Sequence, residues 1–143
     1  MEFIDVHQRV KDAIVEHCAL TYGEQLFRHR GNPDEMLERG FGLEWRRTQR
    51  LGQDGPTATR RSDRGAVLVL IGLETDNQDE ALVRASEFEA SIEDALQQTP
   101  ANPCSVEGVA LRVGDSERRV VGRYLELLIN IEAQWTRDIR PPA

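Results

Sequence analysis

Residues 124–135 read YLELLINIEAQW and alternate between apolar and more polar positions along their whole length. One face holds Leu125, Leu127, Ile129, Ile131, Ala133 and Trp135. The other face holds Tyr124, Glu126, Leu128, Asn130, Glu132 and Gln134. A period of two residues is typical of a β-strand with one buried face and one largely solvated face. The sequence therefore predicts a sheet that a second layer covers on one side.

A long hairpin is predicted near residues 43–66. Residues 43–51 have strand character, residues 52–56 (GQDGP) are rich in turn-forming residues, and residues 66–71 (AVLVLI) are continuously apolar. A run such as AVLVLI suits an inner strand that is covered on both faces. Because the hairpin tip carries few apolar side chains, we expect it to project and to be either mobile or ordered only against a partner.

Two helices are predicted from apolar positions at helical spacing. The first spans about residues 3–20, and its apolar stripe contains Val6, Val10, Ala13 and Ile14. The second follows the capping candidates at 76–79 and ends before residue 99. Its apolar positions are Ala81, Leu82, Ala85, Phe88, Ile92, Ala95 and Leu96.

The remaining segments complete the order α-β-β-α-β-β over a single domain, residues 1–143. Residues 106–113 are predicted as a strand and residues 114–116 (GDS) as the turn that follows it. Residues 21–42 are interpreted as an ordered connection and residues 140–143 as a frayed tail. The predicted class is α+β with two layers, a mostly antiparallel four-stranded sheet and helices packed on one of its faces.

The composition is that of a globular domain, with 143 residues, 39% of them hydrophobic and 30% charged. The formal net charge of −7 argues against a general coating of nucleic acid. Cys18 and Cys104 lack a metal-binding or redox spacing and are interpreted as buried free thiols. We expect no secretory signal and no association with a membrane, because no apolar run approaches the roughly 20 residues that span a bilayer.

No residue pattern indicates catalysis, so we expect a protein that is not an enzyme and uses no cofactor. The sequence contains neither GxSxG nor a glycine-rich phosphate-binding loop. His7, His17 and His29 lack a Cys or acid at metal-ligand spacing, so no metal site is predicted. Only a polar pocket formed by His29, Asp34 and Glu35 would favour an enzyme.

The main local anomaly is an arginine cluster around the predicted hairpin. The candidate partner-binding residues are Trp45, Arg46, Arg47, Arg50, Arg60, Arg61 and Arg64. Between Arg46 and Arg64 six arginines are opposed by two aspartates, a net charge of +4 in a chain of −7. Two interpretations remain open, a solvated hairpin and a basic arm that docks onto a partner. An acidic copy of the same protein, or another acidic partner, fits such an arm better than DNA does.

Three stretches resemble the tail terminator proteins of long-tailed bacteriophages, the lambda-type family and related neck proteins. They are residues 64–73 leading into 79–85, the helix body 88–96, and residues 122–124 running into 129–132. The resemblance covers almost the full chain as a layout of elements, without a diagnostic motif. Residues 21–42 have no place in the family pattern.

The resemblance implies a structural virion protein that forms a ring, caps the finished tail tube and joins the tail to the head. The implied partners are further copies of the chain in a homohexameric ring, the tail tube protein and the head–neck connector or stopper protein. DNA would pass through the lumen without specific binding. The implied location is the tail or neck of the virion, after assembly in the host cytoplasm. The basic hairpin is the candidate for a loop that reaches the tube.

Two other functions remain open from the sequence. Another head–tail joining or tail-tube protein of a phage would have a similar pattern of elements. A small DNA-binding regulator would use the arginine hairpin, and its DNA binding would be salt-sensitive and lost when Arg46, Arg47 and Arg50 are replaced by alanine. The acidic total charge counts against the regulator.

Overall fold

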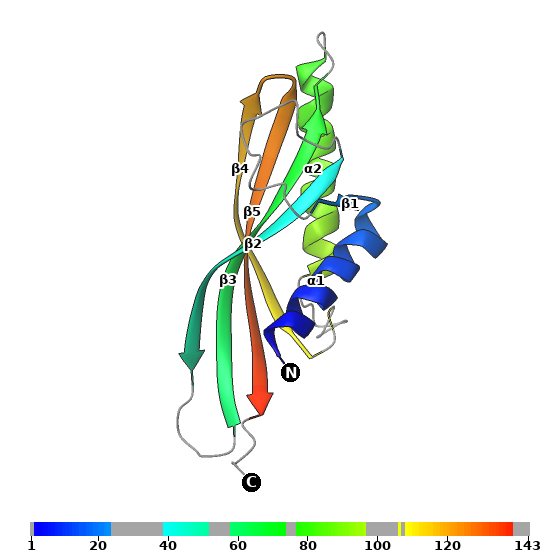
Figure 1. The fold of residues 1–143 in the computed structure, drawn as a ribbon. Coiled ribbons are helices and arrows are strands. Elements are labelled where there is room, and N and C mark those ends of the chain that lie inside the picture. Colours follow the sequence, from blue (N-terminus) through cyan, green and yellow to red (C-terminus); the bar gives the residue numbers. More distant parts are fainter. Residues whose placement is uncertain are drawn as a thin grey trace.

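The computed structural model describes residues 2–23, 39–51, 58–73, 77–96, 106 and 108–138, with the backbone alone at 47–51, 58–61 and 137–138. The elements are α1 (Phe3–Cys18), β1 (Thr21–Tyr22), β2 (Gly40–Leu51), β3 (Ala58–Gly72), α2 (Gln78–Leu96), β4 (Ala110–Val121) and β5 (Tyr124–Asp138). Both helices lie on the same side of one long, strongly twisted sheet (Figure 1). The predicted α+β class, with helices on one face of a sheet, is therefore confirmed.

The sheet is mixed and has five strands in the order β1-β2-β3-β5-β4. The pairs β2–β3, β3–β5 and β5–β4 are antiparallel, whereas β1 runs parallel to β2 through Thr21↔Gly40 and Tyr22↔Phe41. The prediction of a four-stranded sheet in the order α-β-β-α-β-β was wrong in this detail, since β1 adds a strand before β2. A two-residue strand is too short to produce a hydrophobic period, so the sequence pattern could not reveal it.

The main core lies between the helices and the sheet. From the helices it contains Val6, Val10, Ile14, Cys18, Ala81, Ala85, Ile92, Ala95 and Leu96. The six apolar residues predicted on one face of β5 are all buried, and none is more than 4% exposed. Residues 66–71 are each 0% exposed, because β3 lies between β2 and β5 and is covered on both faces. Both predictions are confirmed.

The other face of β5 is more buried than predicted. Tyr124, Glu126 and Leu128 are only 8%, 1% and 6% exposed. The second buried cluster consists of Ala66, Leu68, Leu70, Tyr124 and Leu128. The prediction of a largely solvated face was therefore wrong for the first half of the strand. Glu126 Oε2 accepts a hydrogen bond from Arg119 at 3.0 Å, which offsets part of the cost of burying its charge.

The reversal between the last two strands lies at Gly122 and Arg123. Gly122 has a φ of 56°, in the left-handed region that favours glycine, and pairing resumes at once with Val121↔Tyr124. The predicted turn at 114–116 was wrong, because these residues form an irregularity inside β4. Gly, Asp and Ser are common in turns, and only the cross-strand register separates a turn from a bulge here.

The hairpin predicted near 43–66 falls on β2 and β3. The two strands pair as far as Leu51↔Arg60, and β3 pairs with β5 from Ala58↔Asp138 to Gly72↔Tyr124. The ends of β3 and β5 near the tip extend past the N-terminal end of α1 (Figure 1). Residues 52–57 at the tip and residues 140–143 lie outside the described part of the chain.

Candidate interaction site

Cross-strand pairing places a row of charged residues on the sheet face opposite the helices. Directly paired residues share one face of a sheet. Arg64 of β3 pairs with Glu132 of β5, and Glu132 pairs in turn with Arg112 of β4. The adjacent Ile131 is part of the main core and therefore faces the helices. We call the face that carries Arg64, Glu132 and Arg112 the outer sheet face.

The outer sheet face contains a hollow of about 470 Å³. The charged and polar side chains that line it are Arg46 from β2, Arg64 from β3, Asn130 and Glu132 from β5, and Arg112 and Asp115 from β4. Three arginines and two acids give this lining a net positive charge. We call this site the arginine hollow.

Two strand irregularities flank the arginine hollow and account for its lining. In β2 the register shifts between Trp45 and Arg47, so Arg46 has no paired residue in β3. In β4 a second shift leaves Gly114 and Asp115 outside the register with β5. β-Bulges bend a strand and re-aim its side chains, and they are common beside functional sites. The two shifts lie on opposite edges of the same part of the sheet.

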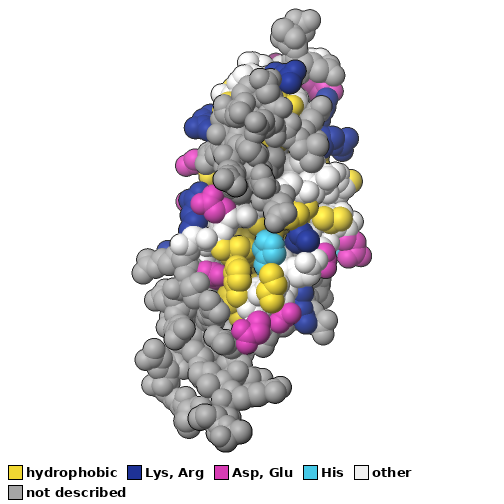
Figure 2. All heavy atoms as spheres, viewed as in Figure 1, with side chains coloured by type: hydrophobic (Ala, Val, Ile, Leu, Met, Phe, Trp, Pro, Cys, Tyr) yellow, Lys and Arg dark blue, Asp and Glu magenta, His cyan; other side chains and the backbone are white. Residues whose placement is uncertain are grey.

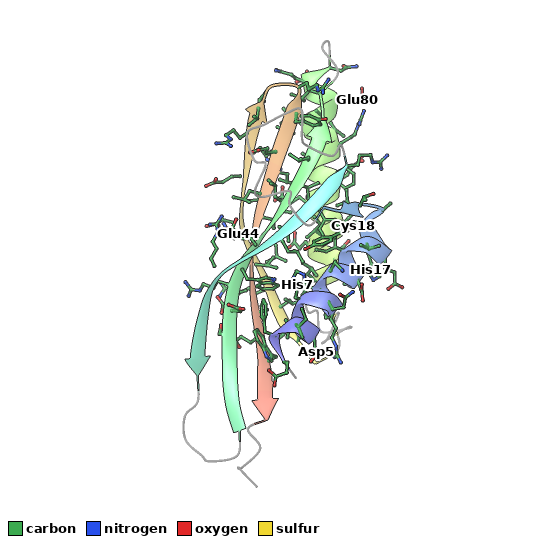
Figure 3. The ribbon with its side chains drawn as sticks, in the orientation of Figure 1. Asp5, His7, His17, Cys18, Glu44 and Glu80 are labelled. Atoms are coloured by element: carbon green, nitrogen blue, oxygen red, sulfur yellow. The ribbon has the colours of Figure 1, made fainter. Side chains whose placement is uncertain are left out.

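The ion pairs at the arginine hollow are long and solvated. Arg64 Nε lies 3.7 Å from Glu132 Oε2, with the side chains 59% and 32% exposed. Arg46 Nε lies 3.3 Å from Glu44 Oε1, and Glu44 points away from the helices (Figure 3). Exposed pairs of this kind contribute about 0–1 kcal/mol to stability. The guanidinium groups can therefore exchange these partners for another anionic group.

Trp45 lies on the opposite face of the sheet from the arginine hollow. Its Nε1 donates a hydrogen bond to His7 Nδ1 at 2.9 Å, and its ring meets Phe3 edge-on with centroids 5.6 Å apart. A Cβ on Gly65 would lie 2.8 Å from Trp45 Cε3, so the indole packs directly on the glycine. Trp45 thus helps α1 to pack on the sheet.

Of the six arginines selected from the sequence, the structure brings Arg46 and Arg64 together. The side chains that lie outside the described part are those of Arg47, Arg50, Arg60 and Arg61. Sequence reasoning missed Arg112, which comes from β4, almost 50 residues after Arg64. Its place beside Glu132 depends on long-range pairing, and no local pattern indicates that neighbour.

His7 connects α1 to β1 and β2. Besides the bond from Trp45 to Nδ1, its Nε2 lies 3.5 Å from Tyr22 Oη. The imidazole points from α1 toward the strands (Figure 3). In the view of Figure 2 a histidine lies among hydrophobic side chains on the surface of the molecule. Burial, and next the positive charge of Lys11, lowers the pKa of His7 below its ordinary value of 6.5.

We expect the free energy of unfolding to decrease below pH 6.5 because of His7. The neutral imidazole accepts the Trp45 bond, so this stabilisation is complete above the unfolded-state pKa and is lost as the pH falls through the lowered folded-state pKa. The expected loss is about 1 kcal/mol, the usual contribution of one hydrogen bond. Urea unfolding of wild type and His7→Gln at several pH values measures it.

The control for this prediction is His17→Gln, which removes an exposed histidine from the same helix. His17→Gln should retain the component below pH 6.5 that His7 contributes, whereas His7→Gln should lose it. If the free energy of unfolding changes with pH in the same way for wild type and His7→Gln, this role of His7 is contradicted.

Among the described residues, no group of three His, Cys, Asp or Glu side chains could hold a metal ion. The enzyme pocket considered from the sequence, His29, Asp34 and Glu35, lies outside the described part, as does Cys104. Cys18 is buried, and burial together with the charge of Asp94 raises the pKa of its thiol to about 11. None of the described helices has the length and apolarity to cross a bilayer.

Comparison of the chain with known protein families gives no match, and comparison with curated proteins gives none either.

Proposed function

We propose that this chain is a structural, non-catalytic virion protein of a long-tailed phage, a tail terminator whose ring caps the tail tube and joins it to the head. The observation that carries the proposal is the layout of elements. The stretches that resemble tail terminators fall on β3 and the start of α2, on the body of α2, and on the β4–β5 turn with β5. These segments contribute to both layers of the domain.

The β2–β3 hairpin is the proposed contact with the tail tube. It is long, with strands of 12 and 15 residues, and the first residues of β3, next to the hairpin tip, extend beyond the helix layer (Figure 1). The sequence between Arg46 and Arg64 has a net charge of +4. A basic arm of this kind docks onto an acidic surface through charge complementarity, which also sets orientation and register.

The overall charge suits a ring through which DNA passes. A homohexamer would have a formal charge of −42, six times that of one chain. Acids that face the lumen would repel phosphate groups and let DNA slide without specific binding. The further partner is the head–neck connector or stopper protein on the side opposite the tube.

The test is native mass spectrometry and light scattering of the purified chain over a range of concentration and salt, with and without tail tubes. We expect a discrete hexamer, formed either by the chain alone or once tubes are added. A strict monomer or dimer that ignores tubes would contradict the proposal. Electron microscopy of tails assembled with and without the chain would locate the ring at the tube end.

The second candidate is a small DNA-binding regulator, and the convergence of Arg46, Arg64 and Arg112 favours it. The net charge of −7 counts against this function, because an acidic chain repels phosphate groups. Titration with duplex DNA over a range of salt separates the two functions. A regulator would bind with a steep salt dependence, which weakens when Arg46, Arg47 and Arg50 are replaced by alanine, and would not bind tubes.

A further inference from the structure

We infer that the arginine hollow receives the outer side of α2 from a second copy of this chain. The inference rests on the proposed ring and names the two surfaces that meet in it. Charge complementarity between two opposite sides of the same molecule carries it.

The α2 helix is strongly acidic on its exposed side. It contains six acids and one arginine, a net charge of −5 in 19 residues. Glu89 is turned toward the sheet, where its carboxylate accepts a hydrogen bond from Arg118 of β4 at 2.7 Å. The exposed acids in the second half of the helix are Glu87, Glu93 and Asp94.

Four exposed residues form a single line along α2. Val83, Glu87, Ala90 and Asp94 follow one another at spacings of four, three and four residues, which places them on one side of a helix. Val83 is 58% exposed although it is apolar, and burying its side chain against a partner would be favourable in free energy. The small side chain of Ala90 lets another surface approach closely between the two carboxylates.

The spacing of charges on the two surfaces matches. Asp94 lies seven positions after Glu87, which is a rise of about 10.5 Å along a helix. Arg64 and Arg112 lie in one cross-strand row on either side of Glu132, about 9.6 Å apart at the usual strand spacing. A helix lying across the strands therefore presents one carboxylate to each arginine. Arg–carboxylate pairs are favoured by their bidentate geometry.

The contact is head-to-tail, because the helix layer and the outer sheet face lie on opposite sides of the molecule (Figure 1). Each copy then offers one surface of each kind, and repetition of such a contact closes into a ring when the rotation allows. Association through the edge of β4 is opposed by its charged residues and its bulge. The chain therefore associates by face-to-face docking of side chains.

The experiment uses charge reversal on either surface of the full-length chain. The hollow variant is Arg64→Glu with Arg112→Glu, and the helix variant is Glu87→Arg with Asp94→Arg. Matched controls reverse charges elsewhere, with Arg123→Glu in the β4–β5 turn and Glu16→Arg on α1, both exposed in wild type. Circular dichroism and thermal unfolding check that each variant is folded. Arg64→Gln with Arg112→Gln replaces the hollow variant where reversal prevents folding.

Each variant alone should need a protein concentration more than about tenfold higher than wild type to assemble, with or without tail tubes. The two controls should assemble like wild type. A mixture of the charge-reversed hollow variant and the helix variant should recover assembly with the two variants alternating, because every contact between unlike copies again joins opposite charges. Native mass spectrometry resolves these species by mass.

Wild-type assembly by both variants would overturn this inference and leave the proposed ring in place. A wild-type chain that remains monomeric on tail tubes would overturn both. Loss of DNA binding by the hollow variant, with assembly unchanged, would show instead that the hollow binds phosphate.

Discussion

Replacing Ile129 with alanine is expected to lower the free energy of unfolding by about 2–5 kcal/mol. Ile129 is 0% exposed, faces the helices and lies in β5 between Val67 of β3 and Ser116 of β4. Truncation removes buried apolar surface and leaves a cavity that paired strands on both sides cannot collapse to fill. Urea unfolding followed by circular dichroism gives the difference directly.

The matched control is Val120→Ala in β4, which truncates an apolar side chain that is 53% exposed. Its effect should stay within about 0.5 kcal/mol, as for most surface substitutions. A loss below 1 kcal/mol for Ile129→Ala would mean that the helix-covered core is packed less tightly than the structure shows.

Replacing Gly65 with valine is expected to cost about 2–3 kcal/mol, near the upper end of the range for overpacking. A Cβ at this position would lie 2.8 Å from both the carbonyl oxygen of Glu44 and Trp45 Cε3. The carbonyl belongs to the paired strand β2, and the indole is held by its hydrogen bond to His7. Neither neighbour can move without breaking a contact that stabilises the fold.

A double-mutant cycle separates the two clashes at Gly65. With Trp45→Leu as background, Gly65→Val should cost less than in wild type, because the indole clash is absent and only the carbonyl clash remains. An equal cost in both backgrounds would show that Trp45 does not constrain Gly65. Gly114→Ala is the comparison variant. A Cβ at Gly114 would lie 3.7 Å from the Asn130 carbonyl oxygen, an ordinary contact distance, so this substitution should be tolerated.

Much of the fold followed from local patterns. The apolar side of α1, the buried run at 66–71 and the buried face of β5 were all predicted from the spacing of apolar residues. A helix or strand that packs against one layer must repeat its apolar side chains with its own period, so the pattern reports the covered side. The order of the longer elements followed in the same way.

The candidate site was predicted only in part. The sequence selected Arg46 and Arg64 as members of a charge cluster, but it grouped them with Trp45, which faces the helices. It gave no indication of Arg112. The arginine hollow depends on register shifts in β2 and β4, and a single displaced residue changes which side chains share a face.

The sequence by itself determined the two helices, the strand character of β2, β3 and β5, and the helix-facing sides of α1 and β5, because these depend on residues a few positions apart; it placed β4 at 106–113 instead of Ala110–Val121. Only the tertiary structure decided the parallel β1 strand, the turn at Gly122, the burial of Glu126 and Leu128, and the convergence of three arginines on the outer sheet face. The turn at Gly122 depends on the register between the consecutive strands β4 and β5, and the other features depend on pairing between strands that are distant in the chain. Such pairing depends on side-chain packing and register across the whole sheet, and no short stretch of sequence determines these.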